Sequence, residues 1–179
     1  MTMNLPNKLT ILRVIMIPFF VFFMLMPVVP YSNLIAVAIF CIASFTDFLD
    51  GYLARRDGLV TNFGKFMDPL ADKLLVGAAL ICLIETGQLP ALVVIIIISR
   101  EFIISGFRLI ASDNGVVIAA SYWGKFKTVS QMAMVIVLIL NIPALALVGQ
   151  ILIWVSTILT VVSLLDYIVK NKDVLKDTK

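Results

Sequence analysis

The stretch DFLDGYLARRDGLVTNFGKFMDPLADKLLVG, from Asp47 to Gly77, joins two long apolar segments through a short run rich in charge. It carries two pairs of aspartates, Asp47 with Asp50 and Asp68 with Asp72, spaced by three and four residues. Residues at these spacings share one face of an α-helix. Because the first helix enters the loop and the second leaves it, the sequence predicts four carboxylates at two neighbouring helix ends.

The composition indicates an integral membrane protein. Of the 179 residues 61% are hydrophobic, and the mean hydropathy is +1.09, whereas a soluble domain is about 45–50% apolar. No polar stretch is long enough for a separate soluble domain, so residues 1–179 are expected to form a single membrane domain. The net charge of +3 comes without a basic patch, which argues against binding to nucleic acid.

The expected fold is all-α, a bundle of six transmembrane helices. A bilayer core about 30 Å thick needs roughly 20 apolar residues per helix. A more polar segment, Met1 to Ile11, is expected at the membrane interface before the first span. Asn141, Pro143 and Gly149 are expected to form the turn between the last two spans. The six predicted spans are about Leu9 to Val29, Leu34 to Leu53, Met67 to Ile84, Ala91 to Ala111, Thr128 to Leu147 and Gln150 to Val169.

The loop charges predict the orientation of these spans. Basic residues gather on the cytoplasmic side of membrane proteins. The loops at 27–33, 85–90 and 141–149 contain no Lys or Arg. We therefore expect a multi-pass protein of the cell membrane with both termini in the cytoplasm. The basic residues of the remaining loops and the tail are Arg55, Arg56, Lys65, Lys125, Lys127, Lys170, Lys172, Lys176 and Lys179.

The four aspartates predict a metal site at the cytoplasmic ends of their helices. A charged side chain within a membrane costs about 2.5–3.5 kcal/mol on insertion scales, and four carboxylates at one depth repel one another. Two divalent cations would supply the missing charge. The chain has no histidine, so oxygen ligands are expected, which suit Mg²⁺, Mn²⁺ or Ca²⁺.

Purely structural roles are conceivable for the individual charges. Asp68 before Pro69 is a typical helix start, and Asp47 or Asp50 could pair with neighbouring arginines. Such roles account for one aspartate at a time but not for all four on two facing helix ends. Arg100 and Glu101 are adjacent in sequence, and pairing across helices is at least as good an interpretation of them as catalysis.

The charged stretch resembles the signature of the CDP-alcohol phosphotransferase family. It matches D-x2-D-G-x2-A-R-x8-G-x3-D-x3-D at every fixed position, over 26 residues. The resemblance implies a six-helix membrane bundle, usually a homodimer. The matching residues are Asp47, Asp50, Gly51, Ala54, Arg55, Gly64, Asp68 and Asp72.

Three further stretches resemble the branch of this family that acts on glycerol 3-phosphate. They are LPNKLTILR (Leu5–Arg13), SREFIISGFRL (Ser99–Leu109) and GKFKT (Gly124–Thr128). The resemblance implies transfer of the phosphatidyl group of CDP-diacylglycerol to sn-glycerol 3-phosphate, with release of CMP. It also implies metal-assisted direct displacement, and no Ser, Cys or His nucleophile for a covalent intermediate accompanies the aspartates.

The resemblance also assigns roles to individual residues. Asp47, Asp50, Asp68 and Asp72 would hold two divalent cations, Mg²⁺ or Mn²⁺, and Asp72 would be the general base. A solvated-loop role is as good an interpretation of Asn7, Thr10 and Thr61. The residues implied around CDP-diacylglycerol are Asn7, Thr10, Gly51, Ala54, Arg55, Thr61 and Gly64.

The acceptor carries a phosphate of its own, which requires basic side chains. Arg108, Lys125 and Lys127 stand at the expected cytoplasmic ends of the fourth and fifth spans, although they could serve only to fix the topology. A phosphorylated acceptor argues against serine but does not separate glycerol phosphate from inositol phosphate. A divalent-cation transporter is a distant alternative, because transporters hold their carboxylates near the midplane and often on internal repeats.

Overall fold

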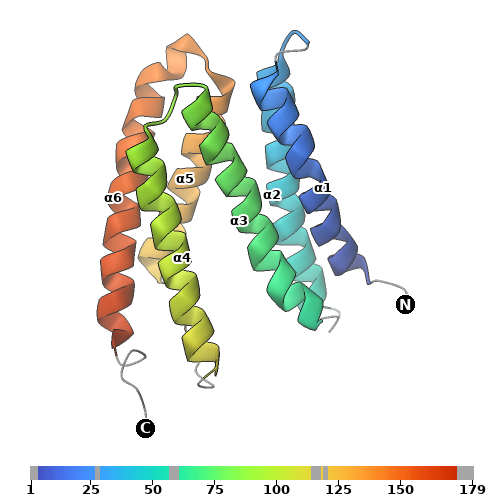
Figure 1. Cartoon of the computed structure of the whole chain (residues 1–179), viewed down its shortest axis with the longest axis vertical. Coiled ribbons are helices and arrows are strands. Elements are labelled where there is room, and N and C mark those ends of the chain that lie inside the picture. Colours follow the sequence, from blue (N-terminus) through green and yellow to red (C-terminus); the bar gives the residue numbers. More distant parts are fainter. Residues whose placement is uncertain (1–3, 27–28, 57–60, 114–117, 119–120, 173–179) are drawn as a thin grey trace. The chain divides into compact units, whose positions relative to one another are not determined.

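The computed structural model describes residues 4–26, 29–56, 61–113, 118 and 121–172. Within these ranges the regular secondary structure is six α-helices and one short 3-10 helix (Figure 1). The all-α fold predicted from the sequence is confirmed. The chain divides into two compact units, Met1–Gln88 and Leu89–Lys179, each with three of the α-helices.

The first unit is built around its amino-terminal helix. Helix α1 (Leu5–Leu25) packs against both α2 (Ser32–Arg56) and α3 (Asn62–Glu85). Phe20 of α1 and Phe40 of α2 are fully buried, with ring centroids 5.9 Å apart. Apolar packing therefore joins α1 to α2 in the half of α1 that carries no charge.

The polar amino-terminal segment belongs to α1. The side chain of Asn4 accepts a hydrogen bond from the backbone N–H of Asn7, at 3.1 Å, and Pro6 stands in the first turn. Both features favour a helix start at this point. The sequence predicted a separate interfacial segment, whereas the residues from Leu5 onward form the first turns of α1.

The second unit consists of α4 (Ala91–Asp113), α5 (Tyr122–Leu140), the 3-10 helix η1 (Pro143–Leu145) and α6 (Ala146–Lys170). Helix α6 packs against both α4 and α5.

The turn between the last two helices comes earlier than predicted. Asn141 adopts the left-handed conformation, with φ 48°, and ends α5. Asparagine tolerates this conformation, and Pro143 cannot continue a helix. The predicted turn at Asn141 and Pro143 is confirmed, but the predicted end of the fifth helix at Leu147 is wrong. Gly149, also predicted in the turn, is buried inside α6.

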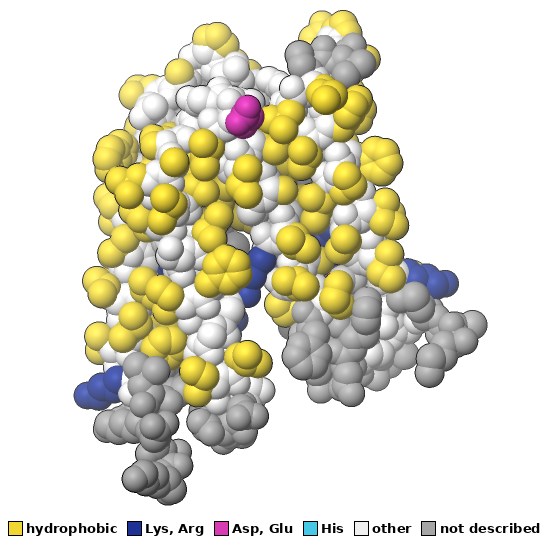
Figure 2. Space-filling view, viewed as in Figure 1, with side chains coloured by type: hydrophobic (Ala, Val, Ile, Leu, Met, Phe, Trp, Pro, Cys, Tyr) yellow, Lys and Arg dark blue, Asp and Glu magenta, His cyan; other side chains and the backbone are white. Residues whose placement is uncertain are grey.

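Four helical segments of the described residues are long and apolar enough to cross a membrane: Leu5–Leu25, Ser32–Leu53, Tyr122–Leu140 and Pro143–Lys170. Figure 2 shows hydrophobic side chains spread along the visible helices, with few charged groups among them. Several such helices make the chain a multi-pass membrane protein. Charged residues interrupt the apolar sequence of the other two helices, which are themselves continuous. They are Asp68, Asp72 and Lys73 in α3, and Arg100, Glu101 and Arg108 in α4. That both also cross the membrane remains a prediction.

Candidate active site

Three buried polar side chains lie along one face of α1. Asn7, Thr10 and Arg13 follow one another at intervals of three residues, and they are 9%, 0% and 0% exposed. A buried guanidinium is strongly destabilising unless it is paired with charge and fully hydrogen-bonded. The hydrogen-bond and charge partners of these three side chains therefore show which parts of α2 and α3 this face of α1 contacts.

Arg13 bonds to the first pair of aspartates. Its Nη1 donates to Oδ1 of Asp47 at 2.6 Å, and its Nη2 donates to Oδ2 of Asp50 at 2.5 Å. Its Nε donates to the backbone carbonyl of Ala43 at 3.2 Å. The three acceptors lie on one face of α2, one and two turns apart, so a single side chain of α1 spans the face that carries both carboxylates.

Thr10 connects α1 to the second pair. Its hydroxyl donates to Oδ1 of Asp68 at 2.6 Å. Thr10 and Arg13 lie three residues apart on one face of α1, so the carboxylates of Asp47, Asp50 and Asp68 gather along that face. Like charges repel one another, and in this cluster of three carboxylates Arg13 offsets only part of the negative charge.

Asn7 connects α1 to the beginning of α3. The Thr61 hydroxyl donates to Oδ1 of Asn7 and accepts the backbone N–H of Gly64, both at 3.0 Å. Thr61 is thus the N-cap of α3, which begins at Asn62. The interpretation of Asp68 as a helix-starting cap is therefore wrong, because Asp68 lies inside α3.

Gly64 lies where several oxygen atoms converge. A Cβ atom at this position would lie 3.3 Å from Oδ2 of Asp68 and 3.4 Å from both Oδ1 of Asn7 and Oγ1 of Thr61. A larger residue would press against all three oxygens. Glycine therefore preserves a small space lined by carboxylate, amide and hydroxyl oxygens, which are donors that hard cations prefer.

The aspartates keep oxygen atoms available for a ligand. Arg13 and Thr10 each contact a single oxygen per carboxylate, and no further described residue bonds to the second oxygen of Asp47, Asp50 or Asp68. Among the described residues, no three acidic or cysteine side chains come close enough to share one ion. In this arrangement the guanidinium of Arg13 lies against the Asp47–Asp50 pair.

The remaining predicted residues of the first unit are less enclosed. Gly51 follows Asp50 on α2 and is partly exposed, and Asp72 is exposed one turn beyond Asp68 on α3. The side chains of Ala54 and Arg55 lie outside the described residues, so their predicted roles stay predictions.

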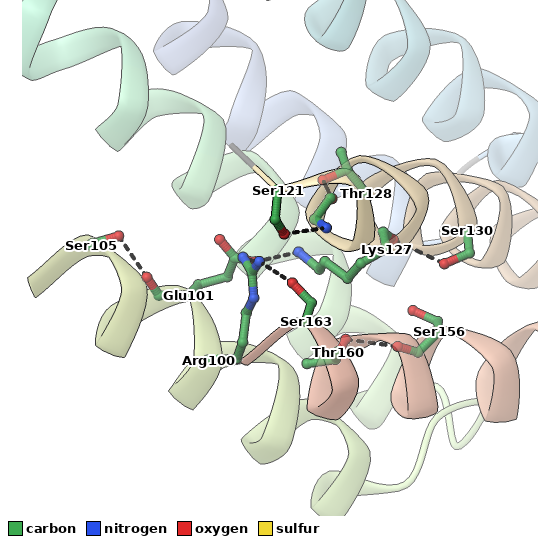
Figure 3. Close-up of polar contacts among 11 residues, drawn as sticks. Arg100, Glu101, Ser105, Ser121, Lys127, Thr128, Ser130, Ser156, Thr160 and Ser163 are labelled. Atoms are coloured by element: carbon green, nitrogen blue, oxygen red, sulfur yellow. Dashed lines mark hydrogen bonds and ion pairs between the residues drawn. The ribbon is translucent and has the colours of Figure 1, made fainter. Parts of the chain in front are cut away.

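The second unit holds a separate polar network (Figure 3). The Lys127 ammonium of α5 pairs with Oε1 of Glu101 on α4, and Nη1 of Arg100 donates to the same oxygen at 3.1 Å. Nη2 of Arg100 donates to the hydroxyl of Ser163 on α6 at 2.6 Å. Arg100 and Lys127 are 9% and 4% exposed. Glu101 thus pairs across helices with Lys127, and Arg100 bonds both to Ser163 of α6 and to its sequence neighbour Glu101. Contact across helices is one of the two roles that the sequence allows these residues.

The three basic residues predicted for the acceptor differ in their surroundings. Lys127 is buried in this network, whereas Arg108 and Lys125 are exposed. The ammonium of Lys125 lies 5.4 Å from the ring centroid of Tyr122. Within its own unit, the structure therefore joins only Lys127 of the three to the buried polar residues.

The chain matches one protein family over most of its length. The model of the CDP-alcohol phosphatidyltransferase family matches residues 3–162. The chain belongs to this family. The match includes the α1 face, both aspartate pairs and the Arg100–Glu101–Lys127 network of the second unit.

Curated proteins of similar length resemble the chain from end to end. A CDP-diacylglycerol–glycerol-3-phosphate 3-phosphatidyltransferase of Bacillus subtilis is 46% identical over 97% of both chains. Proteins of the same name from Haemophilus influenzae and Rickettsia bellii are 42% and 39% identical. They cover 99% and 89% of this chain, and the matches span 98% and 91% of their own length.

Members of the CDP-alcohol phosphatidyltransferase family generally depend on divalent cations. The donors found in the first unit fit such ions, because carboxylate oxygens that no described residue bonds adjoin a space that a Cβ atom on Gly64 would fill. Asp47, Asp50, Asp68 and Asp72 are the residues that would hold them.

Arg13 is the residue of this site that the sequence analysis did not single out. In the sequence it stands only in a basic amino terminus and at the end of a family-like stretch. The signal was available, because an arginine inside the predicted first span, three residues after Thr10, is unfavourable in a membrane unless it pairs with an acid. Its partners on α2 follow only from the packing of α1 and α2.

Proposed function

We propose that the protein transfers the phosphatidyl group of CDP-diacylglycerol to sn-glycerol 3-phosphate, giving phosphatidylglycerol phosphate and CMP. The observation that carries this proposal is the oxygen-lined carboxylate cluster of Asp47, Asp50 and Asp68, on the family's signature residues. The acceptor follows from the names of relatives that match the chain over nearly its whole length.

In this proposal the first unit binds the nucleotide-lipid. Two divalent cations, Mg²⁺ or Mn²⁺, held by Asp47, Asp50, Asp68 and Asp72, would neutralise the diphosphate and stabilise the charge of the leaving group. Gly64 leaves room beside these carboxylates for phosphate oxygens. The residues that would surround the CDP moiety are Asn7, Thr10, Gly51, Ala54, Arg55, Thr61 and Gly64.

The reaction is a direct displacement at phosphorus. A hydroxyl oxygen of glycerol 3-phosphate forms a bond to the phosphorus that carries diacylglycerol, and the bond from that phosphorus to the CMP oxygen breaks. Asp72, which is exposed and one turn from Asp68, accepts the hydroxyl proton. A single in-line attack inverts the configuration at that phosphorus, whereas two successive displacements would retain it.

The second unit would bind the phosphate of the acceptor. Arg108 and Lys125 are exposed cations, and both can reach a phosphate without first giving up a carboxylate partner inside the helix packing. Lys127 is paired with Glu101, so it would contribute by exchanging part of that pairing for the phosphate. An acceptor without a phosphate, such as serine, would leave these charges without a counterpart.

The proposal includes the location, membrane orientation and oligomeric state of the enzyme. Basic loops and tail favour both termini and the active site on the cytoplasmic side of the cell membrane, where CDP-diacylglycerol is drawn from the surrounding lipid. Residues 1–179 would act as a single membrane domain and, by analogy with the family, as a homodimer.

One assay tests the reaction and the choice of acceptor. Purified protein in detergent is incubated with CDP-diacylglycerol and Mg²⁺ or Mn²⁺, together with glycerol 3-phosphate, inositol phosphate or serine, and CMP release is measured. We expect CMP release when glycerol 3-phosphate is the acceptor and none when it is inositol phosphate or serine. Release only with inositol phosphate would reassign the acceptor, and no release with any alcohol would contradict the proposed function.

A further inference from the structure

Arg13 carries the only positive charge bonded to the aspartate cluster in the described part of the first unit. Its side chain is fully buried, and each of its three nitrogens donates to α2. The guanidinium offsets one of the negative charges of Asp47 and Asp50. With any given set of bound cations, the site therefore carries one more positive charge than it would without Arg13.

The extra positive charge affects which cations the site accepts. A positive charge fixed beside a cation site opposes cations that arrive alone. It favours cations that arrive together with a diphosphate, because the diphosphate restores negative charge. The hydrogen bond from Nε to the Ala43 carbonyl anchors the guanidinium. We therefore expect Arg13 to stay beside the carboxylates when another ligand binds there.

We propose that Arg13 is a built-in counter-ion of the Asp47–Asp50 pair that weakens cation binding to the substrate-free enzyme and couples tight cation binding to the nucleotide diphosphate. The proposal rests on the function proposed above, in that the diphosphate belongs to the substrate. It makes Arg13 a positioning residue, since it acts through the two aspartates and not on the reacting atoms.

Two simpler roles for Arg13 would give different results. If Arg13 only clamped α1 to α2, its replacement would lower stability without a specific effect on cation affinity. If Arg13 only oriented the carboxylates for cations, its replacement would weaken cation binding. A counter-ion predicts the opposite sign, because removing its charge makes the site more negative.

The experiment measures Mn²⁺ affinity of the purified full-length protein by electron paramagnetic resonance, with and without CDP as a soluble diphosphate. Titrations of CDP without protein correct for Mn²⁺ bound to free nucleotide. Arg13→Gln removes the charge, and Arg13→Lys keeps it. Lys8→Gln is the matched control, because it removes the same charge from an exposed position of the same helix.

For wild type we expect CDP to raise Mn²⁺ affinity by about tenfold or more. Arg13→Gln is expected to bind Mn²⁺ about tenfold more tightly without CDP, so that the effect of CDP shrinks. Arg13→Lys and Lys8→Gln should stay within about threefold of wild type. Arg13→Gln is prepared with Mn²⁺ present, since the uncompensated carboxylates should lower its unfolding temperature in EDTA.

Several results would overturn the proposal. One is Mn²⁺ binding by Arg13→Gln that is weaker than, or the same as, that of wild type. Another is an Mn²⁺ affinity that rises as much in Arg13→Lys as in Arg13→Gln. The last is a wild-type Mn²⁺ affinity that does not change when CDP is added. The last of these needs no variant, so the test survives if Arg13→Gln does not fold. CMP release is assayed separately, so a failure of the proposed reaction leaves the result on Arg13 readable.

Discussion

Asp72 differs from the other three aspartates in its surroundings. Asp47, Asp50 and Asp68 are bonded to side chains of α1, whereas Asp72 is exposed on the next turn of α3. A carboxylate that receives a proton from a bound alcohol must be accessible to that alcohol. The geometry thus gives Asp72 a property that the proposed base needs.

Asp72→Asn is expected to lower kcat for CMP release by about 10²–10⁴-fold, the usual contribution of general-base catalysis. Added Mn²⁺ should not restore the rate, because the amide cannot accept the proton. Asp166→Asn serves as control, since Asp166 pairs with Lys170 on α6 and lies outside the proposed machinery. A variant at position 72 that regains wild-type kcat at high Mn²⁺ would show that Asp72 acts only as a metal ligand.

Arg108 offers the clearest test of the acceptor site, because it is exposed and outside the buried network of α4–α6. Arg108→Gln is expected to raise KM for glycerol 3-phosphate by about 10–100-fold, the loss of one hydrogen bond to a charged group. KM for CDP-diacylglycerol should change little. Steady-state kinetics with each substrate varied in turn measure both values, with Lys172→Gln as a control of equal charge. Equal increases for the two substrates would rule out a specific acceptor role.

At the scale of elements, the α5–α6 pair depends on a small residue. A Cβ atom on Gly149 of α6 would lie 3.1 Å from Cδ2 of Leu138 and 3.7 Å from Cγ1 of Val137, both on α5. Small residues allow helices in membranes to approach closely. The glycine that the sequence suggested as a turn residue therefore serves helix packing.

Gly149→Leu is expected to lower the free energy of unfolding by about 1–3 kcal/mol, as overpacking does. Gly106→Leu on α4 is the matched control, because a Cβ there meets no atom within 4 Å. That change should be neutral or stabilising, since leucine favours a helix more than glycine by up to about 1 kcal/mol. Thermal unfolding in detergent compares the two, and equal destabilisation would mean that helix contact at Gly149 is not the cause.

The elements also show what could be read from the sequence. Apolar length predicted six helices, and Asn141 with Pro143 predicted the last turn, because these signals are local. The end of the fifth helix was missed, since the apolar run continues through the turn and into α6. The aspartates followed from their spacing and the family pattern, whereas the role of Arg13 depends on which helix packs against α1.

At the scale of the whole molecule, the two units differ in charge. The first gathers carboxylates around one guanidinium, and the second gathers Arg100 and Lys127 around one carboxylate, Glu101. An acidic site suits the cations that accompany a diphosphate, and basic residues suit an acceptor phosphate. A transferase with two phosphorylated substrates needs both kinds of site. A cation transporter does not need the basic site, because it binds no phosphorylated acceptor.

Metal removal tests this division of roles in the intact enzyme. EDTA is expected to abolish CMP release, and Mg²⁺ or Mn²⁺ should restore it, because the donors of the first unit are oxygens. The protein should nevertheless stay folded in EDTA, since Arg13 bonds to Asp47 and Asp50, and Thr10 bonds to Asp68. Activity and thermal unfolding are followed on the same sample, before and after the metal is returned. Activity that persists in EDTA would contradict the cation site. Cooperative unfolding that is lost in EDTA would contradict the stabilising role of Arg13, because a carboxylate pair whose charge is partly offset by a buried guanidinium should not need a metal to fold.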